Sequence, residues 1–315
     1  MPTFSALDRD DHMAELTREQ WDLIIIGGGI TGAGILLDAV SRGLKAALIE
    51  KRDFAWGTSS RSTKLIHGGL RYLKQFEVGL VREVGRERKI VHRNARHIVR
   101  PEQMLLPMYK DGSLGKVSGS LGLWIYDLLA DVGPDEKRRM LSREEILELE
   151  PALKPEGLTG GAVYYEYRTD DARLTIENLK TAVQLGGLAI NYCECMDFRY
   201  DGNGKVNGLV CADRVGGGQF TISARMLINA AGPWVDKVRS MEEVNNENKL
   251  FLTNGLHIVI PQSRMPLKSS LYFDTEIDNR MIFAITREDH VYIGTTDIPF
   301  DGDPDSPQAT EDEMQ

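Results

Sequence analysis

Residues 22–50 read DLIIIGGGITGAGILLDAVSRGLKAALIE, and this stretch decides the fold of the N-terminal part of the chain. Residues 23–26 form a wholly apolar run that ends at glycine, as expected for a parallel strand covered on both faces. Residues 30–42 carry apolar side chains at helical spacing, Gly43 supplies a stop, and residues 46–49 form a second apolar run. The stretch therefore predicts a β-α-β unit.

The turn between the first strand and the helix has the spacing G-x-G-x-x-G. In such a unit the first glycine makes the turn, the second lets the backbone approach a pyrophosphate at the helix N-terminus, and the third allows close helix–strand packing. Glu50 ends the next strand, where a carboxylate can accept hydrogen bonds from ribose hydroxyls. A glycine-rich turn without a ligand is the alternative. The dinucleotide contacts predicted here are Gly27, Gly29, Thr31, Gly32 and Glu50.

The segment after Glu50 suits an extended cofactor. Residues 54–64, FAWGTSSRSTK, supply small residues, hydroxyl groups and two cations, which can hold the second phosphate and ribityl chain of FAD. Residues 65–69 would then pass close to a flat ring. For residues 54–64, a solvated Ser/Thr loop without a ligand is the alternative. Residues 229–234, NAAGPW, form a second small-residue turn, for which plain strand-to-helix packing is the alternative. The cofactor contacts predicted from these segments are Thr58, Ser59, Ser62, Lys64, Leu65, His67, Gly68, Gly69, Ala231 and Gly232.

Four side chains, of which His67 is already among the predicted cofactor contacts, are candidates for contact with substrate or flavin. His67 and His257 lie close to glycine in predicted loop or strand-edge positions, although a lone histidine is more often structural. Arg71 and Tyr72 offer a cation and a phenol to an anion near the flavin, and a solvated helix face is the alternative. No His/Cys/carboxylate spacing resembles a metal site, so we expect no metal.

Composition excludes several classes of protein. The chain has 315 residues, 38 Lys+Arg against 47 Asp+Glu, a formal net charge of −9 and 42% hydrophobic residues, which is an ordinary globular composition. At roughly 150 residues per domain, the length suggests about two domains. The acidic balance argues against general nucleic-acid binding, because excess positive charge is needed to release counterions from phosphates. Cys193, Cys195 and Cys211 include no C-x-x-C pair, which favours a reducing compartment over a disulfide framework.

The rest of the chain mixes helix and strand signals. Residues 78–99 and 121–129 are predicted helices. Ser142 opens a capping box with Glu145, and Asp170 caps a helix that ends at glycine. Strands are predicted at 161–167, 189–192, 226–229, 256–260, 281–285 and 290–294, the last three in an antiparallel sheet, with turns at 201–204 and 216–218.

Five segments together resemble the FAD-dependent glycerol-3-phosphate dehydrogenases. The likeness extends from about residue 20 to residue 315. The block from residue 57 to residue 73 is more specific than the glycine fingerprint, which many flavoproteins and NAD enzymes share. The segments are DLIIIGGGITGAGILLDAVSRG (22–43), GTSSRSTKLIHGGLRYLKQFE (57–77), EYRTDDARL (166–174), NAAGPWVD (229–236) and GTTD (294–297).

The resemblance implies oxidation of sn-glycerol 3-phosphate to dihydroxyacetone phosphate. A hydride would pass from substrate C2 to flavin N5 while a base takes the C2 hydroxyl proton, and electrons would then pass to membrane quinone. His67 would lie near the ring, Arg71 and Tyr72 would bind the substrate, and Thr295 and His257 would line the far side. A relative that uses oxygen, a glycerol-3-phosphate oxidase, is one alternative. An amine- or amino-acid-oxidase-type flavoenzyme, which normally binds a carboxylate, is another.

The predicted fold class is α/β, with a Rossmann-like FAD-binding domain and a mixed or antiparallel-sheet substrate domain, as in glutathione-reductase- or amino-acid-oxidase-like flavoproteins. The expected division is an N-terminal leader segment at 1–20, a discontinuous FAD-binding domain at 21–75 and 172–245, and a substrate domain at 76–171 and 246–315. We expect a cytoplasmic protein, peripherally associated with the cytoplasmic membrane. The expected partners are glycerol 3-phosphate and the quinone pool but no nucleic acid, and a homodimer is an open alternative to a monomer.

Two departures from the family pattern bear on activity. Relatives commonly carry Lys-Gly-x-His where this chain has Asn254 three residues before His257, so a cation is absent while the histidine is kept. The resemblance also implies later Gly-Leu-Arg-Pro and Gly-Gly-Lys segments and a helical C-terminal domain. We therefore expect the 315-residue chain alone to show little activity, because Arg71 would hold the substrate phosphate almost alone. A non-catalytic, truncated FAD-binding fragment is the third alternative.

Overall fold

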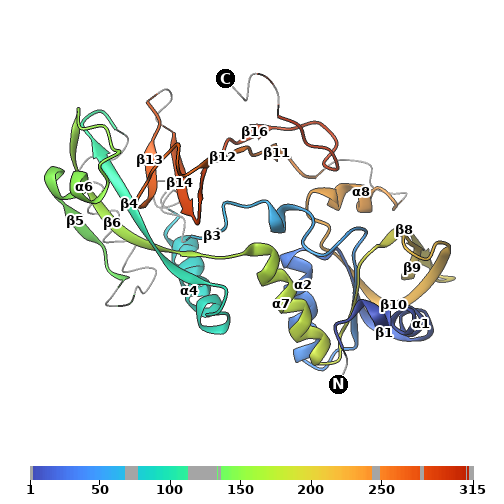
Figure 1. The fold of residues 1–315 in the computed structure, drawn as a ribbon. Helices are drawn as coiled ribbons and strands as arrows, with labels where there is room; N and C mark the ends of the chain where they lie inside the picture. Colours follow the sequence, from blue (N-terminus) through green and yellow to red (C-terminus); the bar gives the residue numbers. More distant parts are fainter. Residues whose placement is uncertain are drawn as a thin grey trace. The chain divides into compact units, whose positions relative to one another are not determined.

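The computed structural model describes residues 3–67, 77–112, 133, 136–242, 249–276, 280–309 and 311. The chain divides into two compact units, each of which draws on segments distant in sequence (Figure 1). Unit 1 comprises Met1–Ser62, Asp170–Leu252 and Phe300–Pro307. Unit 2 comprises Thr63–Thr169, Thr253–Pro299 and Gln308–Gln315.

Unit 1 is built on a mixed sheet that contains the predicted β-α-β unit. Strands β7, β2, β1 and β10 run parallel to one another, and β9 and β8 continue the sheet in antiparallel pairing. The apolar run and glycine turn of residues 22–50 form β1, helix α2 (Ile30–Ser41) and β2, which confirms the prediction. The strands, in sheet order, are β7 (Leu188–Ile190), β2 (Ala46–Ile49), β1 (Gln20–Ile26), β10 (Gln219–Asn229), β9 (Val206–Asp213) and β8 (Cys193–Tyr200).

Helices cover both faces of this sheet. On one face α2 and α7 (Asp171–Gln184) lie side by side, and Leu36, Leu48 and Leu179 belong to the same buried cluster (Figure 1). On the other face, Leu16 of α1 (Arg9–Arg18) is fully buried in a second cluster. We expected residues 1–20 to be a polar leader. They instead contain η1 (Ala6–Asp8) and α1, because a narrow apolar stripe is enough to bury a short amphipathic helix.

Unit 2 is built on an eight-stranded sheet among the described residues, and all its pairings are antiparallel except that of β13 with β4. The antiparallel strands predicted near 256–260, 281–285 and 290–294 are confirmed as β12, β14 and β15. The strands, in sheet order, are β12 (His257–Pro261), β15 (His290–Gly294), β14 (Met281–Arg287), β13 (Ser270–Asp274), β4 (Arg100–Tyr109), β6 (Leu158–Arg168) and β3 (Leu65–Ile66), with β5 (Arg139–Leu141) also paired to β6. Strands β11 (Thr253–Asn254) and β16 (Ile298–Pro299) form a separate pair.

Two helices pack against the sheet of unit 2. Val81 of α4 (Val78–Asn94) joins a buried cluster with Met104, whereas Ile146 of α6 (Arg143–Leu149) joins one with Leu105. Because neighbouring strand residues face opposite ways, the two helices lie on opposite faces. The capping box is confirmed, since Glu145 N–H donates to Ser142 Oγ and Ser142 N–H donates to the Glu145 carboxylate.

The predicted helix at 78–99 is five residues too long. Helix α4 ends at Asn94, and the backbone N–H groups of Ile98 and Val99 both donate to the Ala95 carbonyl in a tight turn. Val99 is fully buried at that turn, immediately before β4, so tertiary burial of this residue ends the helix. The predicted helix at 121–129 lies outside the described residues.

Among the described residues, the bounds of the two units differ from the expected domains at five places. Unit 1 also includes residues 1–20, 170–171, 249–252 and 300–307, and unit 2 also includes residues 63–67. Residues 63–67 join unit 2 because β3 pairs with β6, and residues 300–307 join unit 1 because Phe300 N–H donates to the Leu252 carbonyl at 2.9 Å.

Candidate functional site

A cavity of about 330 Å³ lies in unit 1 at the carboxyl ends of β1, β2 and β10. Ile26, Ile49 and Ala230 mark these ends, and register places Ile26 opposite both Ile49 and Asn229. Ligands of open α/β sheets bind in this position. The cavity lining includes eight of the predicted cofactor residues, Gly27, Gly29, Thr31, Glu50, Thr58, Ser59, Ala231 and Gly232.

The glycine turn keeps its backbone close to neighbouring segments. Gly27 has φ +115°, and a Cβ atom there would lie 2.5 Å from the Ala230 carbonyl oxygen. A Cβ on Gly32 would lie 1.9 Å from the Gly27 carbonyl oxygen. Gly32 does not line the cavity, but it holds α2 against the turn, which is the packing role predicted for the third glycine of the motif.

The N-terminus of α2 is suited to an anion. Its N-cap is Gly29, which offers no side-chain cap, and the first turn carries no acidic side chain to compete with a phosphate. Ile30 N–H donates to Ser59 Oγ at 2.9 Å, so a hydroxyl from the next predicted segment lies beside this end of the helix. The positive end of the helix dipole favours negative charge here.

Glu50 links the glycine turn to the end of β2. Its Oε2 accepts a hydrogen bond from Gly28 N–H at 2.7 Å, and its Oε1 accepts one from Arg52 N–H at 2.8 Å. A carboxylate has about four lone-pair positions, so acceptor capacity remains for a ligand hydroxyl. The sequence predicted the ribose contact of Glu50 but not these two backbone contacts.

Two tryptophans and a lysine form a part of the cavity lining that the sequence did not predict. The ring centroids of Trp56 and Trp234 are 5.9 Å apart, and Lys51 Nζ lies 4.3 Å from the Trp234 centroid. All three line the cavity, and a Cβ on Gly57 would lie 3.0 Å from the Trp234 ring. Within the described part of the chain, Trp234 Nε1 is buried without a hydrogen-bond partner. One sequence signal could have predicted this role, because each tryptophan lies within a segment of small residues that was assigned to the cofactor.

The three cysteines are strand residues. Cys193 and Cys195 lie on β8 and line the cavity, Cys211 lies on β9, and all three are free and buried. Burial raises the pKa of the Cys195 thiol to about 12, so the thiol stays protonated at neutral pH. Within the described residues, no group of three His, Cys, Asp or Glu side chains is placed to hold a metal ion.

Unit 1 does not bring every predicted cofactor residue into this cavity. Ser62 does not line the cavity, because its hydroxyl donates to Asp171 Oδ2 at 2.6 Å at the start of α7. Lys64, Leu65 and His67 belong to unit 2. Gly68, Gly69, Arg71 and Tyr72 lie outside the described residues.

Unit 2 brings three of the predicted substrate-site residues to one region of its sheet. Gly294 on β15 pairs with His257 on one side and with Phe283 on the other. The His67 ring lies 5.7 Å from the Phe283 ring, and Thr295 follows Gly294 directly. His257, Gly294 and Phe283 thus form a row across β12, β15 and β14. His67 contacts one end of this row, His257 is its other end, and Thr295 follows its central residue.

The environment of His257 favours its neutral form. Its Nε2 lies 3.1 Å from Thr63 Oγ1, within hydrogen-bond distance. Burial, and secondly the charge of Lys64, lower the pKa of His257 from its ordinary value. The imidazole is therefore neutral at neutral pH. Its tautomer determines whether Nε2 donates the hydrogen bond to Thr63 or accepts it.

Comparisons with known proteins agree with this architecture. A protein-family model described as FAD dependent oxidoreductase matches residues 22–315. The aerobic glycerol-3-phosphate dehydrogenase of Staphylococcus aureus strain USA300 is 54% identical over 309 residues, which cover 98% of this chain and 56% of that protein. This chain thus spans about half the length of the curated relatives that it matches.

Solved structures show the same fold. The glycerol-3-phosphate dehydrogenase from Bacillus halodurans, determined in complex with FAD, matches with a TM-score of 0.80 and 45% identity, over 99% of this chain and 54% of that one. L-proline dehydrogenase from P. horikoshii matches with a TM-score of 0.70 at 16% identity, over 94% of this chain and 74% of that one, which indicates the fold alone. Among the described helices, none is both long and apolar enough to cross a bilayer.

Proposed function

Because the chain belongs to the FAD-dependent oxidoreductase family, we propose that the cavity of unit 1 holds FAD and that the protein oxidises sn-glycerol 3-phosphate to dihydroxyacetone phosphate. One observation carries the cofactor assignment: the glycine turn, Glu50 and the 58–59 hydroxyls line a single cavity at the N-terminus of α2. The substrate assignment is supported by the identity to glycerol-3-phosphate dehydrogenases.

The lining residues suit the parts of FAD. The N-terminus of α2, with Gly29 and Thr31, would hold the pyrophosphate, and Glu50 would accept hydrogen bonds from the adenosine ribose. Thr58 and Ser59 would donate hydroxyl hydrogen bonds to the phosphates or the ribityl chain, and Ala231 and Gly232 leave room for the cofactor. Bound FAD supplies a ring that accepts a hydride from the substrate.

For the substrate, the proposal rests on the resemblance and on the side chains of unit 2 taken by themselves. His257 is neutral at neutral pH, so its ring can accept the proton of the C2 hydroxyl, which makes it our candidate for the base. His67 and Thr295, on the same region of the sheet, would orient the substrate. For Arg71 and Tyr72, which lie outside the described residues, phosphate binding stays a prediction from the sequence.

The electron acceptor, the location and the assembly are further parts of the proposal. The resemblance to aerobic dehydrogenases supports quinone as the acceptor and peripheral association with the cytoplasmic membrane. Salt or mild detergent should then release the protein from membranes, whereas a requirement for complete bilayer solubilisation would contradict this part. Sedimentation velocity distinguishes the homodimer from the monomer.

A chimaera tests the function without depending on where this chain ends. Residues 1–315 would replace the matching 309-residue part of the S. aureus relative. We expect the chimaera to bind FAD and to reduce an artificial electron acceptor with glycerol 3-phosphate, but not with glycine or proline. A chimaera that binds FAD and is reduced only by an amino acid would overturn the substrate assignment. A folded chimaera that binds no FAD would overturn the cofactor assignment.

A further inference from the structure

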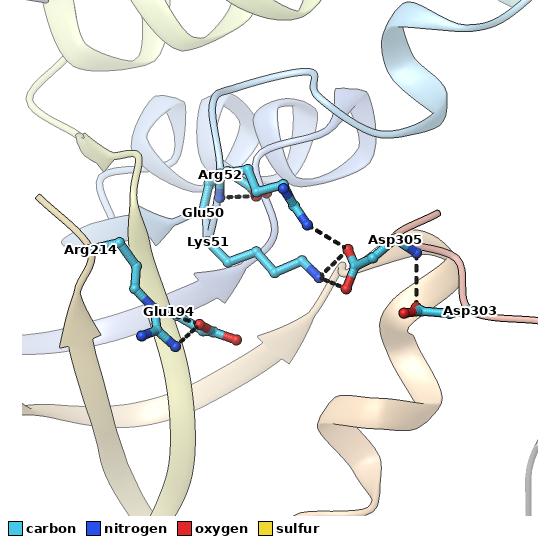
Figure 2. Close-up of polar contacts among 7 residues, drawn as sticks. All are labelled: Glu50, Lys51, Arg52, Glu194, Arg214, Asp303 and Asp305. Carbon is cyan, nitrogen blue, oxygen red and sulfur yellow. Dashed lines mark hydrogen bonds and ion pairs between the residues drawn. The ribbon is translucent and has the colours of Figure 1, made fainter. Parts of the chain in front are cut away.

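Asp305 returns to unit 1 from a region of the sequence otherwise assigned to unit 2. Its carboxylate accepts hydrogen bonds from Lys51 Nζ at 2.9 and 3.2 Å and from an Arg52 guanidinium nitrogen at 3.2 Å. Figure 2 shows the two cations converging on this carboxylate from the loop that follows β2. Two cations next to Glu50 are thus held by one acid from a distant segment.

The backbone around Asp305 fixes the position of its carboxylate. Asp305 N–H donates to Asp303 Oδ1 at 2.9 Å, and Ser306 N–H donates to the Asp303 carbonyl at 3.0 Å, which together form a tight turn (Figure 2). Burial raises the pKa of the Asp305 carboxyl, but hydrogen bonds and charge from Lys51 and Arg52 outweigh burial and leave the pKa below its ordinary value. The acid is therefore ionised at neutral pH.

The ion pair places Lys51 against the cavity. Lys51 Nζ lies 4.3 Å from the Trp234 ring centroid while it donates to Asp305, and both Lys51 and Trp234 line the cavity. The Lys51 and Asp305 side chains are each only 21% exposed. A lysine without this partner would extend into solvent, because its ammonium group is strongly hydrated and its stem is flexible.

We propose that Asp305 is a positioning residue for the dinucleotide: by holding Lys51 over Trp234, it fixes the wall of the cavity beside Glu50 and raises affinity for FAD. This inference rests on the proposed function, since it concerns the same cavity. It assigns a role in cofactor binding to residues 300–307, which no motif of the sequence had connected to the glycine turn.

FAD titration of four single variants, followed by flavin fluorescence, tests the inference. Asp305→Asn removes the charge and preserves the shape, so we expect about tenfold weaker FAD binding, in line with the loss of a partly screened, charge-assisted contact. Asp305→Glu restores the charge and should recover most of the affinity. Asp301→Asn makes the same chemical change at an exposed position of the same segment and should leave affinity within about twofold of the parent.

A double variant separates positioning from general destabilisation. Lys51→Met should weaken binding by a similar factor, and Asp305→Asn should then add nothing in the Lys51→Met background, because the contact is already lost. Parent-like affinity of Asp305→Asn would overturn the inference and leave the proposed function standing. An equal loss in both backgrounds would also overturn it. A parent chain that binds no FAD would contradict the proposed function itself.

Discussion

A Cβ atom on Gly32 would lie 1.9 Å from the carbonyl oxygen of Gly27. The two residues belong to the same turn, and no L side chain fits between them without moving the start of α2 away from β1. Since the proposed phosphate contacts are backbone groups at this helix start, the contact between Gly27 and Gly32 couples the fold of unit 1 to its binding site.

Gly32→Ala should abolish FAD retention and destabilise the folded chain. The methyl group would displace the Gly27 carbonyl, and overpacking of this kind costs about 1–3 kcal/mol or more. The matched control is Gly34→Ala on the same helix, where a Cβ would meet nothing within 4 Å. Removal of a helix-interior glycine should stabilise the control by about 0.5–1 kcal/mol. Urea unfolding and flavin absorbance after gel filtration measure both effects, and FAD retention by Gly32→Ala would refute the prediction.

Glu50→Ala should weaken FAD binding by about tenfold or more, because the ribose loses a carboxylate acceptor and Gly28 N–H loses its partner. The control is Glu194→Ala, another carboxylate of the cavity lining, whose partner is Arg214 (Figure 2). We expect a smaller loss there. Equilibrium dialysis measures both affinities, and equal losses in the two variants would show that Glu50 has no special role.

Arg88→Met should destabilise the chain by about 3–5 kcal/mol, because it removes one cation of a buried ion pair. Arg88 and Glu166 are 3% and 2% exposed, and their ion pair is 2.6 Å long. Lys154→Met, which breaks the exposed pair with Glu276, should leave the free energy of unfolding close to that of the parent. Urea unfolding monitored by circular dichroism measures the two free energies. Similar values for the two variants would contradict the role given to burial.

His257 should make the folded state sensitive to acid. Because its folded pKa lies below the ordinary value of 6.5, the unfolded chain takes up a proton first as pH falls. Stability is therefore lost as pH falls below the unfolded pKa, and the loss ends once pH passes the folded pKa. His257→Gln should lose less stability than the parent between about pH 7 and pH 5. Urea unfolding at both pH values measures this, and identical losses would contradict it.

The parts of the fold that the sequence predicts are those encoded by neighbouring residues. The apolar run before Gly27 determines β1, and Asp170 accepts a hydrogen bond from Arg173 N–H as the cap of α7. The parallel pairing of β13 with β4 has no such local signal, because strand partners far apart in sequence are selected by packing of the whole unit.

The same limit explains which site residues were missed. The glycine turn and Glu50 stand in one motif with fixed spacing, whereas Lys51 acquires its role from Asp305, more than 250 residues later. Trp234 contacts Trp56 only because the ends of β2 and β10 face one cavity. In unit 2, His257 and Phe283 become neighbours of Gly294 through strand register, which the residue pattern alone does not determine.

Equilibrium dialysis of the 315-residue chain against FAD tests most directly whether the cavity at the carboxyl ends of β1, β2 and β10 is a flavin site. We predict that each chain retains a single FAD, that Gly32→Ala abolishes retention, and that Gly34→Ala preserves it. A folded parent chain that retains no FAD, or a Gly32→Ala variant that retains as much as the parent, would contradict the assignment.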